Sequence, residues 1–172
     1  MAGRRCVVLG AGGFVGGAFA RAARDRGFTV VPVGRDGWDA PEAQSADLLV
    51  LAHGNGRRYW AEEHAAEDFE ASVVAVGRAL AAFPAARVVL ASTIDVYDTP
   101  DDLLRTHEAA PIDPLRLSTY GFHKRLAELL VLHAAPRALV ARLGAMVGPG
   151  LVKGPVFDLL AGRPLRVDDE SR

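Results

Sequence analysis

The chain has 172 residues, of which half are apolar, and its formal net charge is -1. This length suits one domain with a buried core, and the balanced charge with scattered arginines argues against a nucleic-acid-binding surface. The single cysteine, Cys6, excludes a disulfide within the chain. The sequence shows neither a signal peptide nor an apolar run near the ~20 residues of a transmembrane helix, so we expect a cytoplasmic protein without membrane contact.

The first predicted element is a strand that runs into a glycine-rich turn. Residues 6–9 form an apolar, strand-forming run, and Gly10, Gly13 and Gly16 follow it. In such a corner the first glycine permits a sharp turn, the second lets the backbone approach a pyrophosphate, and the third lets a helix pack closely on the sheet. A helix that starts near Phe14 would aim its free N–H groups at the phosphates. A glycine-rich turn is also compatible with a plain strand-to-helix connection.

Strands and helices alternate along the rest of the chain. Helical spacing of apolar residues predicts a helix over residues 14–26 with Gly27 as its C-cap, and Pro32 places the second strand at a sheet edge because proline cannot donate to a β-ladder. The further predicted strands cover residues 28–33, 47–52, 87–91 and 138–142, and the further helices cover residues 62–83, 118–133 and 156–160, with a strand start at 164–167. The alternation predicts a compact, doubly wound α/β fold of the Rossmann type, a parallel sheet with helices on both faces.

The loop after the strand over residues 47–52 is rich in small residues. Ligands of open α/β sheets bind at the carboxyl ends of the strands, where this loop and the glycine-rich turn meet. The residues predicted to contact a bound cofactor there are Gly10, Gly13, Phe14, Val15, Gly16, Ala52, His53 and Gly54. The five histidines show no metal-ligand spacing with carboxylates, so we predict no metal site.

The helix over residues 118–133 carries the side chains best suited to chemistry. Tyr120 and Lys124 lie four residues apart, so both leave one face of the helix. An ammonium nearby favours the phenolate and lowers a pKa that is normally near 10, which makes tyrosine a usable general acid or base. Only two of the twenty basic residues are lysines, so the general composition of the chain does not account for a lysine at this position. A chance pair on a helix surface is the alternative. The residues expected on or near the apolar side of this helix, which Ser118 or Thr119 caps, are Leu126, Leu129, Leu130 and His133.

Thr93 is the third candidate for a part in the reaction. It follows the strand over residues 87–91 by two residues, at the edge where the ligand loops meet. Its hydroxyl is able to polarise a substrate carbonyl or alcohol while Tyr120 moves the proton. The alternative is that Ser92 and Thr93 only satisfy backbone groups at the end of a strand.

Four motifs in this order, GAGGFVG, STIDVY, YGFHK and RLGAMVGPG, resemble the extended short-chain dehydrogenase/reductase family, and within it the NAD(P)-dependent sugar-nucleotide epimerase and dehydratase branch. The resemblance implies that the three glycines of the turn hold the cofactor pyrophosphate. It implies further that Thr93 stands at the position of the catalytic Ser/Thr, that Tyr120 is the catalytic acid/base, and that Lys124 binds the nicotinamide ribose. It also implies hydride transfer at the nicotinamide, a nucleotide-sugar or related hydroxyl/keto substrate, and a homodimer formed through the helices over residues 62–83 and 118–133.

Three departures from the family pattern refine this reading. Ser72 falls near the position of a helical asparagine, and Ile94 and Asp95 replace the Asp-Glu pair of standard 4,6-dehydratases. Where the family has an acidic residue after the second strand, the chain has a glycine followed by Arg35. A guanidinium in place of the carboxylate favours a 2′-phosphate and hence NADP(H), and Asp36 keeps NAD(H) possible.

The expected organisation is an NAD(P)-binding Rossmann domain over residues 1–150 and the start of a truncated substrate-binding region over residues 151–172. In the resembled family this last segment leads into further strands and helices, so we expect either a fragment of a longer protein or a natural short form. The main hypothesis is an NAD(P)-dependent oxidoreductase or epimerase. The alternative is an NADP(H)-binding sensor or a partner-dependent subunit without independent catalysis.

Overall fold

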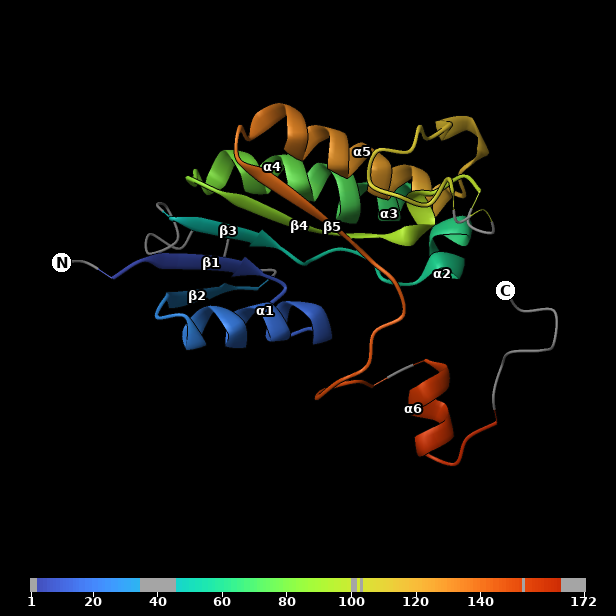
Figure 1. Ribbon diagram of the computed structural model, residues 1–172, viewed down its shortest axis with the longest axis horizontal. Helices are drawn as coiled ribbons and strands as arrows, with labels where there is room; N and C mark the ends of the chain where they lie inside the picture. The colour runs from blue at the N-terminus through green and yellow to red at the C-terminus, as the bar shows by residue number, and fades with distance from the viewer. Residues whose placement is uncertain (1–2, 35–45, 100–101, 103, 153, 165–172) are drawn as a thin grey trace.

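The computed structural model describes residues 3–34, 46–99, 102, 104–152 and 154–164. Within them one parallel sheet has the strand order β2-β1-β3-β4-β5 (Figure 1). The strands are β1 (Arg5–Leu9), β2 (Thr29–Val33), β3 (Leu48–Leu51), β4 (Val88–Thr93) and β5 (Ala138–Leu143). The α-helices are α1 (Phe14–Asp25), α2 (Arg58–Glu63), α3 (Ala65–Phe69), α4 (Ala75–Ala82), α5 (Thr119–Ala134) and α6 (Pro155–Leu160). The π-helix η2 (Glu70–Val74) and the 3-10 helices η3 (Ile94–Val96) and η4 (Pro114–Arg116) complete the elements.

The strand order reverses at β1, because β2 pairs on one side of it and β3 on the other. Leu9, the last residue of β1, is in register with Val33 of β2 and Leu51 of β3. All the carboxyl ends therefore meet at one edge of the sheet, with the switch point between β1 and β3. The predicted doubly wound fold is confirmed, and so is the edge position of the strand that contains Pro32.

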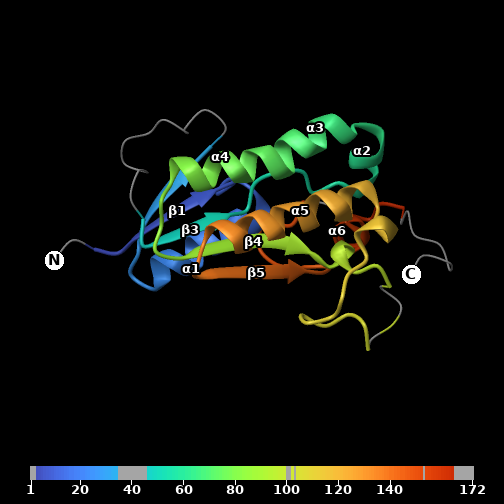
Figure 2. The same ribbon diagram turned by 90° about the horizontal axis from the view of Figure 1, so that it is seen from above.

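Helices cover both faces of the sheet. Figures 1 and 2 show α1 on one face, and α4 and α5 side by side on the other. Because strand side chains alternate, Val7 and Leu9 of β1 pack toward α4 and α5, whereas Cys6 and Val8 pack toward α1. Cys6 is fully buried, as a small hydrophobe would be. None of the described helices is both long and apolar enough to span a bilayer.

The predicted helix over residues 62–83 is wrong in its start and its continuity. It begins with α2 at Arg58 and is interrupted at His64, whose φ of -133° and ψ of 57° lie outside the helical region. The His64 ring stacks on Trp60 at 4.9 Å between ring centroids. Farther along, η2 widens the helix for one turn, and Asp68 and Ser72 stay buried on the side that faces α5.

The helix α5 packs on the sheet through a different face from the one expected. Ser118 caps it as predicted, because its Oγ accepts from the N–H of Gly121 at 3.2 Å. The buried residues follow a helical stripe, and they are Tyr120, Gly121, His123, Lys124, Ala127, Glu128 and Val131. Leu129, Leu130 and His133 are exposed. The expected apolar side faces outward because buried partners satisfy the polar groups on the inward side.

Glu128 shows how a charged residue is accommodated in this interface. Its fully buried carboxylate accepts from Arg142 Nε and Nη2 at 3.0 and 2.9 Å, from Arg125 Nη1 at 2.8 Å and from Ser92 Oγ at 2.6 Å. These bonds join α5 to β4 and β5. Since both carboxylate oxygens are paired, burial of the charge is tolerated.

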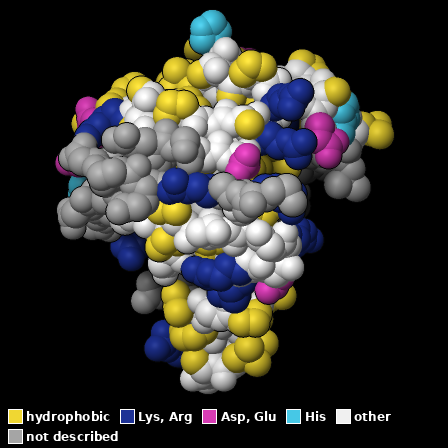
Figure 3. Space-filling model, turned by 90° about the vertical axis from the view of Figure 1, so that its left-hand side faces the viewer, with side chains coloured by type: hydrophobic (Ala, Val, Ile, Leu, Met, Phe, Trp, Pro, Cys, Tyr) yellow, Lys and Arg dark blue, Asp and Glu magenta, His cyan; other side chains and the backbone are white. Residues whose placement is uncertain are grey.

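The remaining predicted elements agree closely with the structure. The predicted strand ends shift by one or two residues, and Thr93 is the last residue of β4 rather than a loop residue after it. Gly27 follows α1 with a φ of 77°, as a C-capping glycine does. The predicted strand start at 164–167 lies almost wholly outside the described residues. At the amino ends of the strands, Arg side chains are scattered over the surface rather than gathered in one patch (Figure 3).

Candidate active site

The glycines of the first turn let β1, α1 and β3 approach one another. Gly10 has a φ of 80°, which favours glycine, and a Cβ there would collide with the carbonyl of Ala52. A Cβ at Gly16 would collide with the carbonyl of Gly10, so the predicted turn and packing functions of these two glycines are confirmed. Gly13 is the N-cap of α1 and donates to the Gly10 carbonyl at 2.9 Å. The positive end of the α1 dipole therefore lies at the switch point.

The loop after β3 brings the second group of predicted residues to the same edge. Gly54 has a φ of 98°, and a Cβ on it would lie 3.5 Å from Ser72 Oγ and 3.6 Å from Lys124 Nζ. The loop thus passes directly over η2 and α5. Since Ala52 contacts Gly10 at its other end, the loop connects the glycine-rich turn to Lys124.

His53 in this loop turns its ring toward the start of α4. The ring nitrogens are buried, and the ring interacts with the backbone of Ala75. Burial, with the charge of Lys124 as a smaller cause, lowers the His53 pKa from 6.5 to about 4. The imidazole is therefore neutral at pH 7. A cofactor contact of His53 stays a prediction.

Thr93 and Tyr120 come together where β4 ends and α5 begins. Thr93 Oγ1 donates to Asp95 Oδ2 at 2.7 Å and accepts from the Asp95 N–H at 3.2 Å. The Thr93 hydroxyl also interacts with the phenol of Tyr120, which is 8% exposed. A Cβ at Gly121 would collide with the Asp95 carbonyl, so glycine at this position permits the close approach. Asp95 in turn pairs with Arg58 at 3.6 Å.

The pKa of Tyr120 moves opposite to the expectation from the sequence. It is raised from 10 to about 12, mainly by burial and also by the charges of Asp95 and Asp68, while the hydrogen bond with Thr93 acts in the opposite direction. Lys124 Nζ lies 5.6 Å from the centroid of the Tyr120 ring. The expected net lowering of the Tyr120 pKa is wrong for this structure, because a buried phenolate loses its solvation and two acidic side chains lie near it.

Lys124 has a buried acidic neighbour that the sequence reasoning missed. Burial lowers the pKa of Lys124, and the charge of Asp68 raises it. Asp68 is fully buried, and its carboxylate accepts from His123 Nδ1 at 2.7 Å and from Ser72 Oγ at 3.4 Å. An acidic residue beside the apolar stripe of the helix, four residues before Ser72, was the signal available in the sequence.

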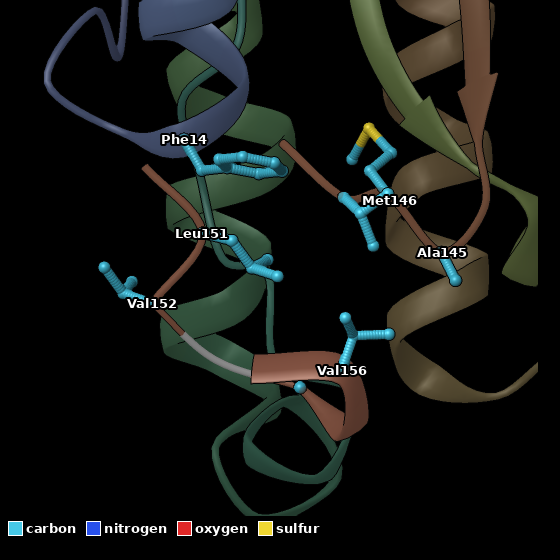
Figure 4. Close-up of a pocket in the computed structure, with 8 residues that line it drawn as sticks. Phe14, Ala145, Met146, Leu151, Val152 and Val156 are labelled. Carbon is cyan, nitrogen blue, oxygen red and sulfur yellow. The ribbon is translucent and has the colours of Figure 1, made fainter. Parts of the chain in front are cut away.

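Two hollows are formed with the segment that follows β5. The first, of about 310 Å³, is apolar and lies between the start of α1 and the segment after β5. In Figure 4 Phe14 lies across this space from Met146, and Leu151 points into it. The second, of about 760 Å³, is called the basic hollow here. It lies between the loop after β3 and α6, and its lining residues are Gly56, Arg57, Arg58, Tyr59, Gly154, Asp158, Arg163 and Pro164.

Two further predictions concern the cofactor and metals. Arg35 lies outside the described residues, so its contact with a 2′-phosphate stays a prediction. The N–H of Gly10 donates to the Val33 carbonyl at 3.3 Å, so β2 ends beside the glycine-rich turn. Within the described parts of the chain no group of three or more His, Cys, Asp or Glu side chains is placed to hold a metal ion.

A parallel sheet with a glycine-rich turn at its switch point defines a Rossmann-type domain. Residues 6–159 match the model of the NAD dependent epimerase/dehydratase family, and the chain belongs to this family. The resemblance found in the sequence is thereby confirmed. No curated protein matches the chain at a significant level.

Solved structures share the fold over most of the chain. The structure of TunA, an NAD-dependent NDP-hexosamine 5,6-dehydratase, has a TM-score of 0.79 at 21% identity over 92% of this chain and 61% of its own. A UDP-galactose 4-epimerase has a TM-score of 0.76 at 24% identity over 92% and 62%. MoeE5 in complex with UDP-glucose and NAD has a TM-score of 0.70 at 25% identity over 85% and 56%. The chain thus spans less than two thirds of the length of each.

Proposed function

We propose that the chain is the NAD(P)-binding and acid/base part of an oxidoreductase or epimerase that acts on a nucleotide sugar or a related hydroxyl/keto substrate. The observation that carries this proposal is the meeting of Thr93, Tyr120 and Lys124 at the carboxyl edge of the sheet, beside the glycine-rich turn. Membership of the family supports the same activity.

The residues at this edge fit a dinucleotide. A Cβ at Gly10 or Gly16 would fill the space where strand, helix and loop converge, and α1 directs its N-terminal end there. Gly13, Phe14 and Val15 would hold the pyrophosphate, and Ala52, His53, Gly54 and Lys124 would hold the adjoining nucleoside. When bound, the nicotinamide supplies or accepts the hydride.

Tyr120 is the proposed general acid/base. Its Oη holds the proton that a substrate hydroxyl loses on oxidation or a carbonyl gains on reduction. Thr93 orients the phenol and polarises the substrate oxygen. A cation beside the phenolate counteracts the rise in pKa that burial causes, and Lys124 is the group placed to supply it.

The basic hollow is the proposed place of the substrate diphosphate. Arg57, Arg58 and Arg163 contribute three guanidinium groups to its lining, against the one carboxylate of Asp158. Guanidinium groups suit phosphate oxygens. Arg58 also pairs with Asp95, so the hollow adjoins Thr93 and the acid/base group. A sugar at Tyr120 would then have its diphosphate next to these arginines.

The proposed cofactor is NADP(H), with NAD(H) as the alternative. Arg35 after β2 supports NADP(H), because a guanidinium pairs with a 2′-phosphate. Affinities for NADPH and NADH measured by calorimetry decide between the two. Tighter binding of NADH would contradict the preference.

Replacement of Tyr120 by Phe tests the function. The variant keeps the ring and loses the hydroxyl that carries the transferred proton. We therefore expect turnover with keto-sugar nucleotides to fall about 100-fold or more, while NADPH affinity stays within twofold. Tyr97→Phe, which also removes one phenol hydroxyl, at a tyrosine that packs on Arg142 outside the basic hollow, is the matched control. Turnover of Tyr120→Phe equal to that of the unmodified chain would refute the assignment.

The second candidate function is binding without catalysis. The pKa of Tyr120 favours it, because a phenol whose pKa is raised to about 12 by burial and by nearby acidic charges is a poor base near pH 7. NADPH binding without turnover of any nucleotide sugar in a panel is the result that supports a sensor or a partner-dependent subunit.

We further propose the division into an NAD(P)-binding domain over residues 1–150 and the start of a substrate-binding region over residues 151–172, which limited proteolysis tests. The cytoplasmic location and the homodimer stay predictions.

A further inference from the structure

Asp68 places a negative charge in the interior next to Lys124, and the proposed mechanism gives it no part. It comes from α3 and is, with Glu128, one of two acidic residues at 0% exposure among the described residues. A buried carboxylate is costly unless hydrogen bonds and an opposite charge compensate it. Its partners therefore indicate what the charge does.

Two hydrogen bonds fix the orientation of this carboxylate. Oδ2 accepts from His123 Nδ1 at 2.7 Å, and because a carboxylate oxygen only accepts, the proton lies on Nδ1. Oδ1 accepts from Ser72 Oγ at 3.4 Å. The His123 ring is held against Phe69 in an edge-to-face contact with centroids 5.4 Å apart.

The same carboxylate lies close to the Lys124 ammonium. Ser72 Oγ and Lys124 Nζ face one position, the missing side chain of Gly54, at 3.5 and 3.6 Å from it. His123 is the chain neighbour of Lys124 on α5. The ammonium is thus enclosed by the Gly54 loop, η2 and α5, with Asp68 as its acidic neighbour.

We propose that Asp68 is a positioning residue for Lys124: held by His123 and Ser72, it keeps the buried ammonium protonated and directed toward the Gly54 loop. The proposal rests on the proposed function only in that Lys124 belongs to the candidate active site. It explains why a histidine precedes Lys124, since His123 supplies the hydrogen bond that fixes the carboxylate.

The charges around Lys124 agree with this assignment. Burial acts against the ammonium, and Asp68 is the group that raises the Lys124 pKa. His53 faces Lys124 from the loop and is neutral, with its pKa lowered to about 4. Tyr120 on α5 is neutral as well, with its pKa raised to about 12, and Asp95 acts on Tyr120. Loss of Asp68 therefore leaves a buried ammonium without its countercharge.

The two lysines of the chain make a direct test practical. NMR of the protein labelled with ¹³Cε-lysine gives one signal for Lys124 and one for Lys153, which Lys124→Met assigns. In Asp68→Asn we expect the midpoint of the Lys124 titration to fall by about 1 to 3 pH units, the range for loss of an adjacent opposite charge. Asp68→Glu keeps the charge, so its Lys124 midpoint should return most of the way to that of the unmodified chain. Asp68→Ser replaces the first variant if Asp68→Asn does not fold.

Glu128→Gln is the matched control, because Glu128 is the other fully buried carboxylate and pairs with arginines. We expect it to leave the Lys124 midpoint unchanged. A Lys124 midpoint that is the same in Asp68→Asn and the unmodified chain overturns the proposal, and so does an equal shift in Glu128→Gln. The titration requires no turnover, so failure of the proposed function and failure of this proposal are separate results.

Discussion

Tyr120, Lys124 and His53 lie in one buried cluster. Burial raises the pKa of the tyrosine and lowers those of the lysine and the histidine, so it favours the neutral form of each. For the tyrosine this shift opposes use as a base, whereas for the histidine it prevents a second cation beside Lys124. The charges of Asp68 and Asp95 act on the same groups. Because these buried groups and charges lie close together, a charge added at this edge of the sheet would change the protonation of several of them.

His53 provides a prediction for the pH dependence of stability. Its pKa is about 4 in the folded chain and 6.5 without burial, so the unfolded chain binds the proton first as the pH falls. The contribution of neutral His53 to the free energy of unfolding is fully present above pH ~6.5 and is lost as the pH falls toward ~4. The loss between pH 7 and pH 5 is up to about 2 kcal/mol. Urea unfolding at both pH values should show a smaller difference in His53→Asn than in the unmodified chain.

His107, which is exposed, serves as the control for this experiment. His107→Asn should keep the full difference between pH 7 and pH 5. An unchanged difference in His53→Asn would show that other groups cause the acid sensitivity.

Single residues were predictable where chemistry and spacing determine them. Gly10 and Gly16 were recognised because only glycine fits such turns, and Tyr120 and Lys124 because helical spacing places them on one face. The pKa direction of Tyr120 was missed because burial depends on residues far away in the chain. Asp68 was missed for the same reason, since its partner His123 is 55 residues away.

At the scale of elements, α5 links the sheet to the candidate site. Its capped start brings Tyr120 to Thr93, its middle carries Lys124, and Glu128 fixes it to β4 and β5. The sequence predicted the length of this helix but assigned its faces wrongly, because leucines indicate an apolar face without indicating which partner covers it. The break at His64 was missed since neither proline nor glycine marks it.

Gly121 tests how closely α5 must approach η3. Gly121→Ala places a Cβ against the Asp95 carbonyl, so we expect a loss of about 1–3 kcal/mol in the free energy of unfolding. Gly77→Ala in α4 is the matched control, because a Cβ at Gly77 would meet no atom within 4 Å outside its own helical turn, and alanine favours a helix by about 0.5–1 kcal/mol. Urea unfolding measures both. Equal stability of Gly121→Ala and the unmodified chain would contradict the close contact.

At the scale of the whole molecule, the two faces of the sheet differ in how their helices meet the surroundings. On one face α1 packs against β1, β2 and β3. On the other, α4 and α5 lie side by side, and α5 turns an apolar stripe outward. The exposed members of that stripe on α5 include Phe122, Leu129 and Leu130, at 37%, 47% and 37% exposure. Such a stripe is typical of a helix that packs against a further surface.

We predict that this outward stripe of α5 forms a homodimer interface. A glutamate in the stripe would bury an unpaired charge, so Leu129→Glu should raise the dimer dissociation constant about tenfold or more in sedimentation velocity. Leu139→Glu is the matched control, because Leu139 is 61% exposed on β5, outside the α5 stripe. A monomer at all concentrations of the unmodified chain would refute the dimer. Dissociation by Leu139→Glu instead of Leu129→Glu would place the interface at β5, since the variant that introduces the charge into the contact is the one that separates the chains.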